Sequence, residues 1–146
     1  MSVVGLTINN ITAKRTNDQL GPVEIGHKVG IKNVEETDLS ALGKKGLKVS
    51  FEFETSYTDD KKKAIGEILI TGEVFYLANN LAELVMGWKR EKKLPDDVNI
   101  VCINTVIKRC MNKAIVLAED VNLPPPIPIP FAQKDVTQDN KSRYIG

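Results

Sequence analysis

The clearest hydrophobic pattern in the chain is a strict alternation of apolar and polar residues over residues 47–57, LKVSFEFETSY. Leu47, Val49 and Phe51 would point to one side of an extended strand, and Lys48 and the alternate residues after it would point to the other. Such a pattern is typical of an antiparallel strand with one solvated face. Weaker alternation predicts three further strands, over residues 3–15, 27–36 and 64–77.

Glycine, proline and polar residues separate the predicted strands. Residues 20–26, LGPVEIG, predict a turn or an irregular edge, and residues 37–46, TDLSALGKKG, predict a loop. Residues 58–63, TDDKKK, have the composition of a polar hairpin tip. Within the fourth predicted strand, Gly72 marks either a β-bulge or a close approach of another backbone.

The period of the pattern changes from 2 to 3.6 at residues 79–80, where asparagine is a suitable helix N-cap. The predicted short helix ends in the basic residues 89–93, KREKK, which the helix dipole favours at a C-terminus. Leu94 followed by Pro95 then interrupts the helix. The apolar stripe of this helix consists of Leu81, Leu84, Val85 and Trp88.

A long second helix is predicted from about Val98 to about Val121, with Asp96 or Asp97 as its N-cap. At ~1.5 Å per residue it would be roughly 36 Å long. It carries apolar residues on two sides, so the sheet could cover one side and a second subunit the other. The inner set is Val98, Val101, Cys102, Thr105, Val106, Cys110, Lys113, Ala114 and Leu117, and the second set is Ile103, Ile107, Met111 and Ile115.

The two cysteines, Cys102 and Cys110, both lie in this predicted helix. Eight helical residues would separate their Cα atoms by ~12 Å, whereas a disulfide requires less than ~7 Å. Two thiols and one distant histidine also do not make a metal site. We therefore expect both cysteines to be small buried apolar residues.

The order of these elements predicts an α+β fold, in which a four-stranded antiparallel sheet is followed by a short and a long helix. We expect a single domain over residues 1–131 and a flexible polar tail over residues 132–146. The net charge of +1 gives no signal for nucleic acid, and no apolar run approaches the ~20 residues of a membrane span. The first residues do not resemble a signal peptide, so we expect a cytoplasmic protein.

No set of residues has the pattern of a catalytic centre. His27 is the only histidine and lies far in sequence from both cysteines, which favours a surface residue. Residues 43–46, GKKG, lack the spacing of a phosphate-binding loop. Glu67 and Glu73 would be ~20 Å apart along one strand, which is too far for a catalytic pair and is typical of a solvated face. We therefore expect no enzymatic activity and no cofactor.

The segment after the long helix, residues 121–131, reads VNLPPPIPIPF. It is too apolar for an idle linker and too rich in proline for the interior of a sheet. Proline fixes φ and has no N–H, so such a segment is extended and loses little entropy on ordering. Two interpretations stay open: Ile127, Ile129 and Phe131 seal the open end of the core, or they line an apolar groove for another chain.

The complete pattern resembles the SecB family of export chaperones, over roughly residues 3–131. In that family a glycine–aromatic passage, here residues 72–80, GEVFYLANN, leads from the last strand into a short helix. A long helix follows, and then a segment of the type PPLxLxPxxF. The positions that match this segment are Leu123, Pro124, Pro125, Pro130 and Phe131.

The resemblance implies a homotetramer, built as a dimer of dimers, that binds unfolded (pre)proteins without ATP in protein export or quality control. Its grooves would be lined from the sheet, the short helix and the proline-rich segment. The client-binding positions that it implies are Phe75, Tyr76, Leu84, Trp88, Ile127, Ile129 and Phe131.

Two features depart from the family. SecB proteins use an acidic sheet face and the C-terminal tail to bind the SecA motor, whereas this chain is near neutral and its tail, residues 134–146, carries both signs. Binding to SecA is therefore in doubt, and a SecB-like chaperone linked to a toxin–antitoxin system is a variant of the same interpretation. Glu52, Glu54, Glu67 and Glu73 could supply some acidity on the sheet.

Two alternatives belong to other functional classes. A non-enzymatic adaptor with one fixed protein partner would also need exposed apolar surface, and binding to several unrelated unfolded proteins would distinguish a chaperone from it. A small-ligand enzyme of the thioesterase type would need a central helix early in the chain. Here both predicted helices follow all four strands, which argues against that enzyme.

Overall fold

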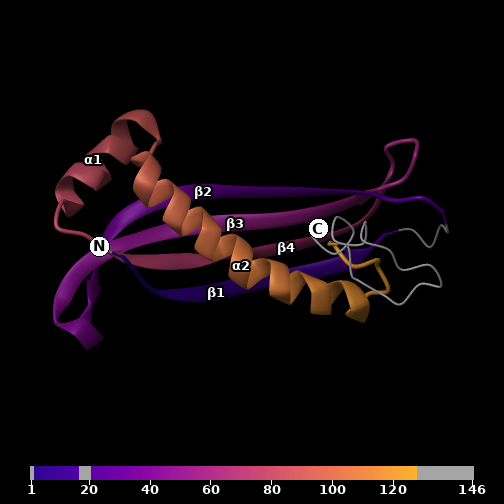
Figure 1. Cartoon of the computed structure of the whole chain (residues 1–146), viewed down its shortest axis with the longest axis horizontal. Helices are drawn as coiled ribbons and strands as arrows, with labels where there is room; N and C mark the ends of the chain where they lie inside the picture. Colours follow the sequence, from indigo (N-terminus) through magenta and orange to yellow (C-terminus); the bar gives the residue numbers. More distant parts are fainter. Residues whose placement is uncertain (1, 17–20, 128–146) are drawn as a thin grey trace, which may run out of the picture.

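Four antiparallel strands form one sheet in the order β1-β4-β3-β2 (Figure 1). The structure is a computed structural model of the chain, and it describes residues 2–16 and 21–127. The predicted α+β fold, with four antiparallel strands followed by a short and a long helix, is confirmed. The strands are β1 (Ser2–Arg15), β2 (Glu24–Leu39), β3 (Lys44–Thr58) and β4 (Ala64–Leu77).

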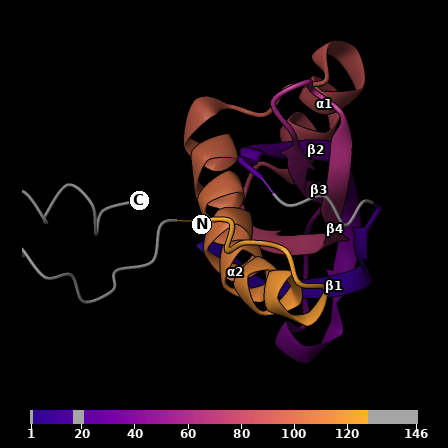
Figure 2. The ribbon, with the colours of Figure 1, turned by 90° about the vertical axis from the view of Figure 1, so that its right-hand side faces the viewer.

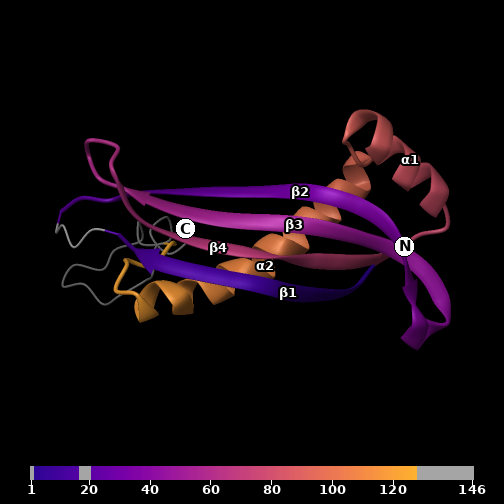
Figure 3. The same cartoon turned by 180° about the vertical axis from the view of Figure 1, so that it is seen from behind.

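Two α-helices follow the sheet: α1 (Leu81–Glu91) and α2 (Asp96–Asp120). Helix α2 crosses one face of the sheet diagonally, and α1 lies at one end, where it contacts β2 (Figures 1 and 3). A view turned by 90° shows α2 on one side of the sheet only (Figure 2). Neither α1 nor α2 covers the opposite face of the sheet.

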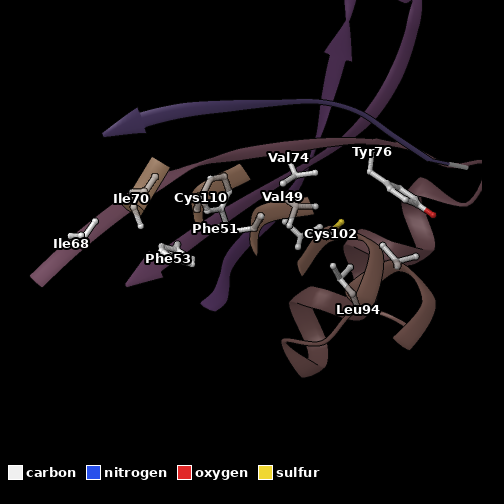
Figure 4. Close-up of a cluster of buried hydrophobic side chains, with 14 of the residues drawn as sticks. Val49, Phe51, Phe53, Ile68, Ile70, Val74, Tyr76, Leu94, Cys102 and Cys110 are labelled. Carbon is white, nitrogen blue, oxygen red and sulfur yellow. The ribbon is translucent and has the colours of Figure 1, made fainter. Parts of the chain in front are cut away.

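The alternating burial of residues along β3 confirms the predicted strand with one solvated face. Leu47, Val49 and Phe53 are completely buried under α2, whereas Lys48 and Glu52 on the opposite face are partly exposed. Burying apolar area in this way contributes about 25 cal/mol per Å². The core therefore forms between α2 and the inner faces of the two central strands, β3 and β4 (Figure 4).

Helix α2 contacts the sheet through every fourth residue. A row of residues spaced by four is inclined to the helix axis, and such a row matches a helix that crosses the strands diagonally. For this reason the predicted inner set was partly wrong: Val101 is 41% exposed and Lys113 is exposed, while Thr105 and Leu117 are half-buried. The buried row is Val98, Cys102, Val106, Cys110, Ala114 and Ala118.

The buried cysteines behave as the sequence indicates. Cys102 and Cys110 are free thiols that are at most 1% exposed. Burial raises the pKa of each thiol to about 11, because the low-dielectric core disfavours the thiolate. Both side chains therefore act as small uncharged core residues, as predicted.

The predicted second apolar set on α2 lies beside the buried row. Ile103, Met111 and Ile115 are half-buried and Ile107 is exposed. Ile100 extends the exposed side of this set, because it lies seven residues before Ile107, whereas Val101 and Val116 are exposed on other sides of the helix.

The connection between β2 and β3 is shorter than predicted. Instead of a loop over residues 37–46, β2 continues to Leu39, a single 3-10 turn (η1, Ser40–Leu42) follows, and Gly43 reverses the chain at a φ of 64°. Gly46 explains this tight connection, because a Cβ there would lie 2.4 Å from Cδ1 of Leu39. The predicted turn or irregular edge at residues 20–26 is also shorter, since β2 begins at Glu24.

The ends of the helices differ slightly from the prediction. Asn80 is the N-cap residue of α1, but its side chain makes no capping hydrogen bond. Pro95, rather than Asp96 or Asp97, is the N-cap of α2. Both aspartates instead lie in the first turn, where the positive end of the helix dipole stabilises them.

The predicted irregularity at Gly72 is present. The pairing register of β1 with β4 shifts between Ile8 and Asn10, directly opposite Gly72. A Cβ on Gly72 would lie 2.0 Å from the carbonyl oxygen of Thr7, which is closer than real Cβ atoms approach. Both a bulge and a close backbone approach therefore occur here, and only glycine fits.

Replacing Gly72 with alanine should destabilise the protein by about 3 kcal/mol or more, because β1 must move away from β4. The matched control is Gly30→Ala on β2, where a Cβ would meet nothing within 4 Å. That change should alter stability by about 0.5 kcal/mol or less. Urea denaturation measures both, and equal effects would contradict the close packing of β1 on Gly72.

Candidate functional site

A hollow of about 640 Å³ lies on the sheet face that α2 does not cover. It is at the end of the sheet where β1 begins, β4 ends and η1 joins β2 to β3. Its volume is within the range of small-ligand pockets. The lining is mainly apolar and includes Val4, Leu39, Ala41, Leu42 and Phe75.

Strand β4 places one predicted client-binding residue in this hollow. Phe75 alternates with Val74 and Tyr76, so its ring points away from α2. It is half-buried and directly opposite Lys48 of β3. Lys48 forms an ion pair of 2.7 Å with Glu35, and this contact raises the pKa of the lysine. The hollow therefore has an apolar floor with a charged pair beside it.

Tyr76 points the opposite way, into the core. It is 5% exposed and lies in the buried cluster with Val74 and Cys102 (Figure 4). Burial raises its pKa, and the negative charge of Asp97 adds to this effect. Because adjacent strand residues face opposite sides, Phe75 and Tyr76 cannot line the same surface of one chain.

The two predicted positions on α1 are also in the core. Leu84 and Trp88 are buried, and α1 contacts β2. The indole N–H of Trp88 has no hydrogen-bond partner among the described residues, and the ammonium of Lys92 lies 5.7 Å from its ring centroid. An unpaired buried donor is unfavourable, and the cation–π contact offsets part of that cost.

The proline-rich segment lies at the other end of the sheet from the hollow. Ile127 is half-buried there, and the two remaining predicted positions, Ile129 and Phe131, fall outside the described residues, as does the predicted tail. The structure therefore does not bring the seven predicted residues into one groove within a single chain. Client binding by these residues stays a prediction.

Sequence reasoning did not find the apolar partners of Phe75. Leu39 and Leu42 were included in a predicted loop, although two leucines in such a short segment were a visible signal. Val4 was included in the first strand without a role. Leu42 is 49% exposed, which makes it the most accessible large apolar side chain of the hollow.

His27 is exposed, as predicted, yet both of its ring nitrogens have partners. Nδ1 is 3.0 Å from Oγ1 of Thr55, and Nε2 is 2.9 Å from the carbonyl oxygen of Pro126. The histidine therefore links strand β2 to the proline-rich segment, a role that its sequence position did not reveal.

Outside the hollow, the outer face of the sheet is largely polar, although the half-buried Leu69 of β4 also lies on it. Glu67 forms a 3.2 Å ion pair with Lys14, and both carboxylate oxygens of Glu73 accept hydrogen bonds from Asn9. Both pairs join β4 to β1 across the solvated face, in agreement with the expected role of these glutamates. Among the described residues, no group of three or more His, Cys, Asp or Glu is arranged to hold a metal ion.

No helix within the described part of the chain combines the length and the hydropathy that crossing a membrane requires. No family model matches the sequence, and no curated protein matches it either.

A solved structure does match the fold. The chain aligns with the SecB-like chaperone Rv1957 of Mycobacterium tuberculosis, solved in complex with a ChAD peptide from the Rv1956 HigA1 antitoxin, at a TM-score of 0.57. The alignment covers 92% of each chain, with 8% sequence identity. The chain therefore has the fold of SecB-like chaperones, as the sequence resemblance indicates. At 8% sequence identity, the similarity shows a shared fold alone.

The opposite orientations of Phe75 and Tyr76 predict different costs for the same substitution. Tyr76→Ser should destabilise the chain by about 3 kcal/mol, as large-to-small changes in a core do. Phe75→Ser should cost about 1 kcal/mol or less, because its ring is only half-buried on the solvated face. Urea denaturation measures both free energies of unfolding, and a loss for Phe75→Ser as large as that for Tyr76→Ser would make Phe75 a core residue.

Proposed function

We propose that this protein is an ATP-independent chaperone that binds unfolded polypeptides in protein export or quality control. The observation that carries the proposal is an accessible apolar hollow on a SecB-like fold. An unfolded client exposes scattered apolar side chains, and burying them contributes about 25 cal/mol per Å². Binding of this kind needs no nucleotide and no reacting side chain.

Of the predicted client-binding residues, Phe75 is the one proposed to contact a client directly in this hollow. Leu42 and Val4 supply further exposed apolar surface beside it. A hollow bordered by an ion pair accepts apolar side chains while the client backbone stays near polar groups and water. This arrangement favours unspecific contacts with short apolar stretches over recognition of one sequence.

Self-association is part of the proposal. The exposed side chains of Ile100 and Ile107, which lie seven residues apart on one side of α2, support the dimer of dimers that the sequence resemblance implies. Exposed apolar side chains on one helix face commonly mark an interface. We place the chaperone in the cytoplasm.

The second candidate function is an adaptor with one fixed protein partner. The M. tuberculosis protein was solved with a peptide from one antitoxin, and the same hollow would serve a single peptide as well as many. The net charge of +1 keeps association with SecA in doubt. The range of binding partners distinguishes the two functions, because an adaptor should not bind unrelated unfolded proteins.

The direct test is suppression of aggregation of two unrelated unfolded proteins without nucleotide. The unaltered protein should suppress both, and Phe75→Ser should weaken suppression about tenfold, because it removes the largest apolar side chain in the hollow. Leu69→Ser is the matched control, since Leu69 lies on the same face of β4 outside the hollow. No suppression by the folded, unaltered protein would overturn the chaperone and leave the adaptor.

Assembly is tested by light scattering. Replacing both Ile100 and Ile107 with aspartate should reduce the measured mass to that of a smaller species, because buried carboxylates would be desolvated in the interface. Asn112→Asp adds a charge at an exposed position of α2 that lies on a different side of the helix from Ile100 and Ile107, and it should leave the mass unchanged. An unaltered protein that is already monomeric would contradict the proposed assembly.

A further inference from the structure

The segment that follows α2 is attached to the sheet in an unusual way. We call residues 122–127 the proline strap. It leaves the helix through a left-handed residue, Asn122, at a φ of 59°. The amide of Leu123 donates to the carbonyl of Ala118 at 2.8 Å, and the amide of Asn122 donates to that of Glu119 at 3.2 Å. This Schellman pattern ends the helix and turns the strap back over the sheet.

Two side chains of the strap are buried. Leu123 is 5% exposed and lies against Gly66 of β4, where a Cβ would be 2.9 Å from Cδ1 of the leucine. Pro126 is also buried, while Asn122 and Pro125 are exposed. Gly66 therefore leaves room for an apolar side chain, and the rest of the strap stays at the surface.

The carbonyls at every second position of the strap accept hydrogen bonds from side chains of three strands. Arg15 of β1 donates through Nη1 to the carbonyl of Asn122. The hydroxyl of Tyr57, on β3, donates to the carbonyl of Pro124 at 2.8 Å. His27, on β2, contacts the carbonyl of Pro126 through Nε2 at 2.9 Å. Consecutive prolines have no N–H, so they cannot pair as a strand. Side-chain donors therefore take the place of the backbone hydrogen bonds that join paired strands.

The donors are held in their orientations. A carbonyl oxygen only accepts, so Nε2 of His27 must carry the hydrogen. In the neutral ring Nδ1 then accepts the hydroxyl hydrogen of Thr55, which is completely buried on β3. Burial raises the pKa of Tyr57 to about 12, so its hydroxyl remains a donor well above neutral pH.

We propose that Arg15, His27 and Tyr57 form a binding site for an extended, proline-containing peptide, and that the proline strap fills this site until such a segment of another polypeptide replaces it. The three donors bind main-chain carbonyls, which every polypeptide presents. Only the positions of Leu123 and Pro126 require side chains of suitable shape. Extended proline segments are pre-ordered and are bound through carbonyls and apolar side chains in other proteins as well.

The site is separate from the hollow of the proposed function. The strap lies where β1 and β3 end and β4 begins, whereas the hollow includes Val4 at the start of β1 and Phe75 at the end of β4. The strap competes in cis at a high effective concentration, so a second peptide binds the unaltered chain more weakly than a chain whose strap is weakened. The experiment therefore opens the site within the complete chain.

The full-length variant Leu123→Ala with Pro126→Ala removes both buried side chains of the strap. A fluorescent peptide of residues 121–131, VNLPPPIPIPF, should bind this opened variant at least about tenfold more tightly than the unaltered chain. Adding His27→Ala and Tyr57→Phe should weaken that binding about tenfold or more, as the loss of two hydrogen bonds predicts. The control peptide has alanine in place of each proline and should bind more weakly.

A folded opened variant that binds the peptide no better than the unaltered chain would overturn the proposal. So would binding that does not change when His27 and Tyr57 are replaced.

A second measurement applies if the opened variant does not fold. Tyr57→Phe keeps the buried ring and removes only the donor, so the chain should remain folded. Hydrogen exchange at the amides of Leu123 and Ile127 should accelerate several-fold, while exchange in β4 stays unchanged. Unchanged exchange of the strap amides would show that the donors do not hold the strap, and would contradict the proposal.

Discussion

The close contact between α2 and the sheet is the constraint on which the remaining structure depends. One helix must cover the inner faces of four strands, and it does so through a diagonal row in which Cys102, Cys110, Ala114 and Ala118 are small. Small side chains bring the helix axis close to the sheet, so that the large residues of β3, such as Phe51 and Phe53, fill the space beside it. A larger residue in this row would push the helix away from the whole core.

Helix α2 alone leaves three regions of the structure that it does not cover. At one end, residues of η1 and Phe75 of β4 line the apolar hollow. At the other end, the proline strap closes the core with Leu123, and side chains from three strands bind its carbonyls. The outer side of α2 keeps exposed apolar residues. The two apolar surfaces at the hollow and on α2 are where we propose that clients and further copies of the chain bind.

The order and type of the elements could be predicted because period 2 and period 3.6 are local properties of the sequence. The orientation of individual residues along α2 could not, because it depends on the angle at which the helix crosses the sheet. Phe75 and Tyr76 seemed one aromatic pair, yet the pleat separates them. His27 lacked any local signal, since its partner Pro126 is 99 residues away in the sequence. Within the hollow, Val4 and Phe75 likewise lie together only because β1 pairs with β4.

The central claim is that unfolded polypeptides bind in the hollow beside Phe75. Photo-crosslinking from a benzophenone side chain at Leu42 tests it most directly, with Met86 on α1 as an even more exposed position outside the hollow. With a permanently unfolded protein present, our account predicts strong crosslinks from position 42 and weak ones from position 86. A client that binds the chaperone but crosslinks equally from both positions, or only from α1, would contradict it.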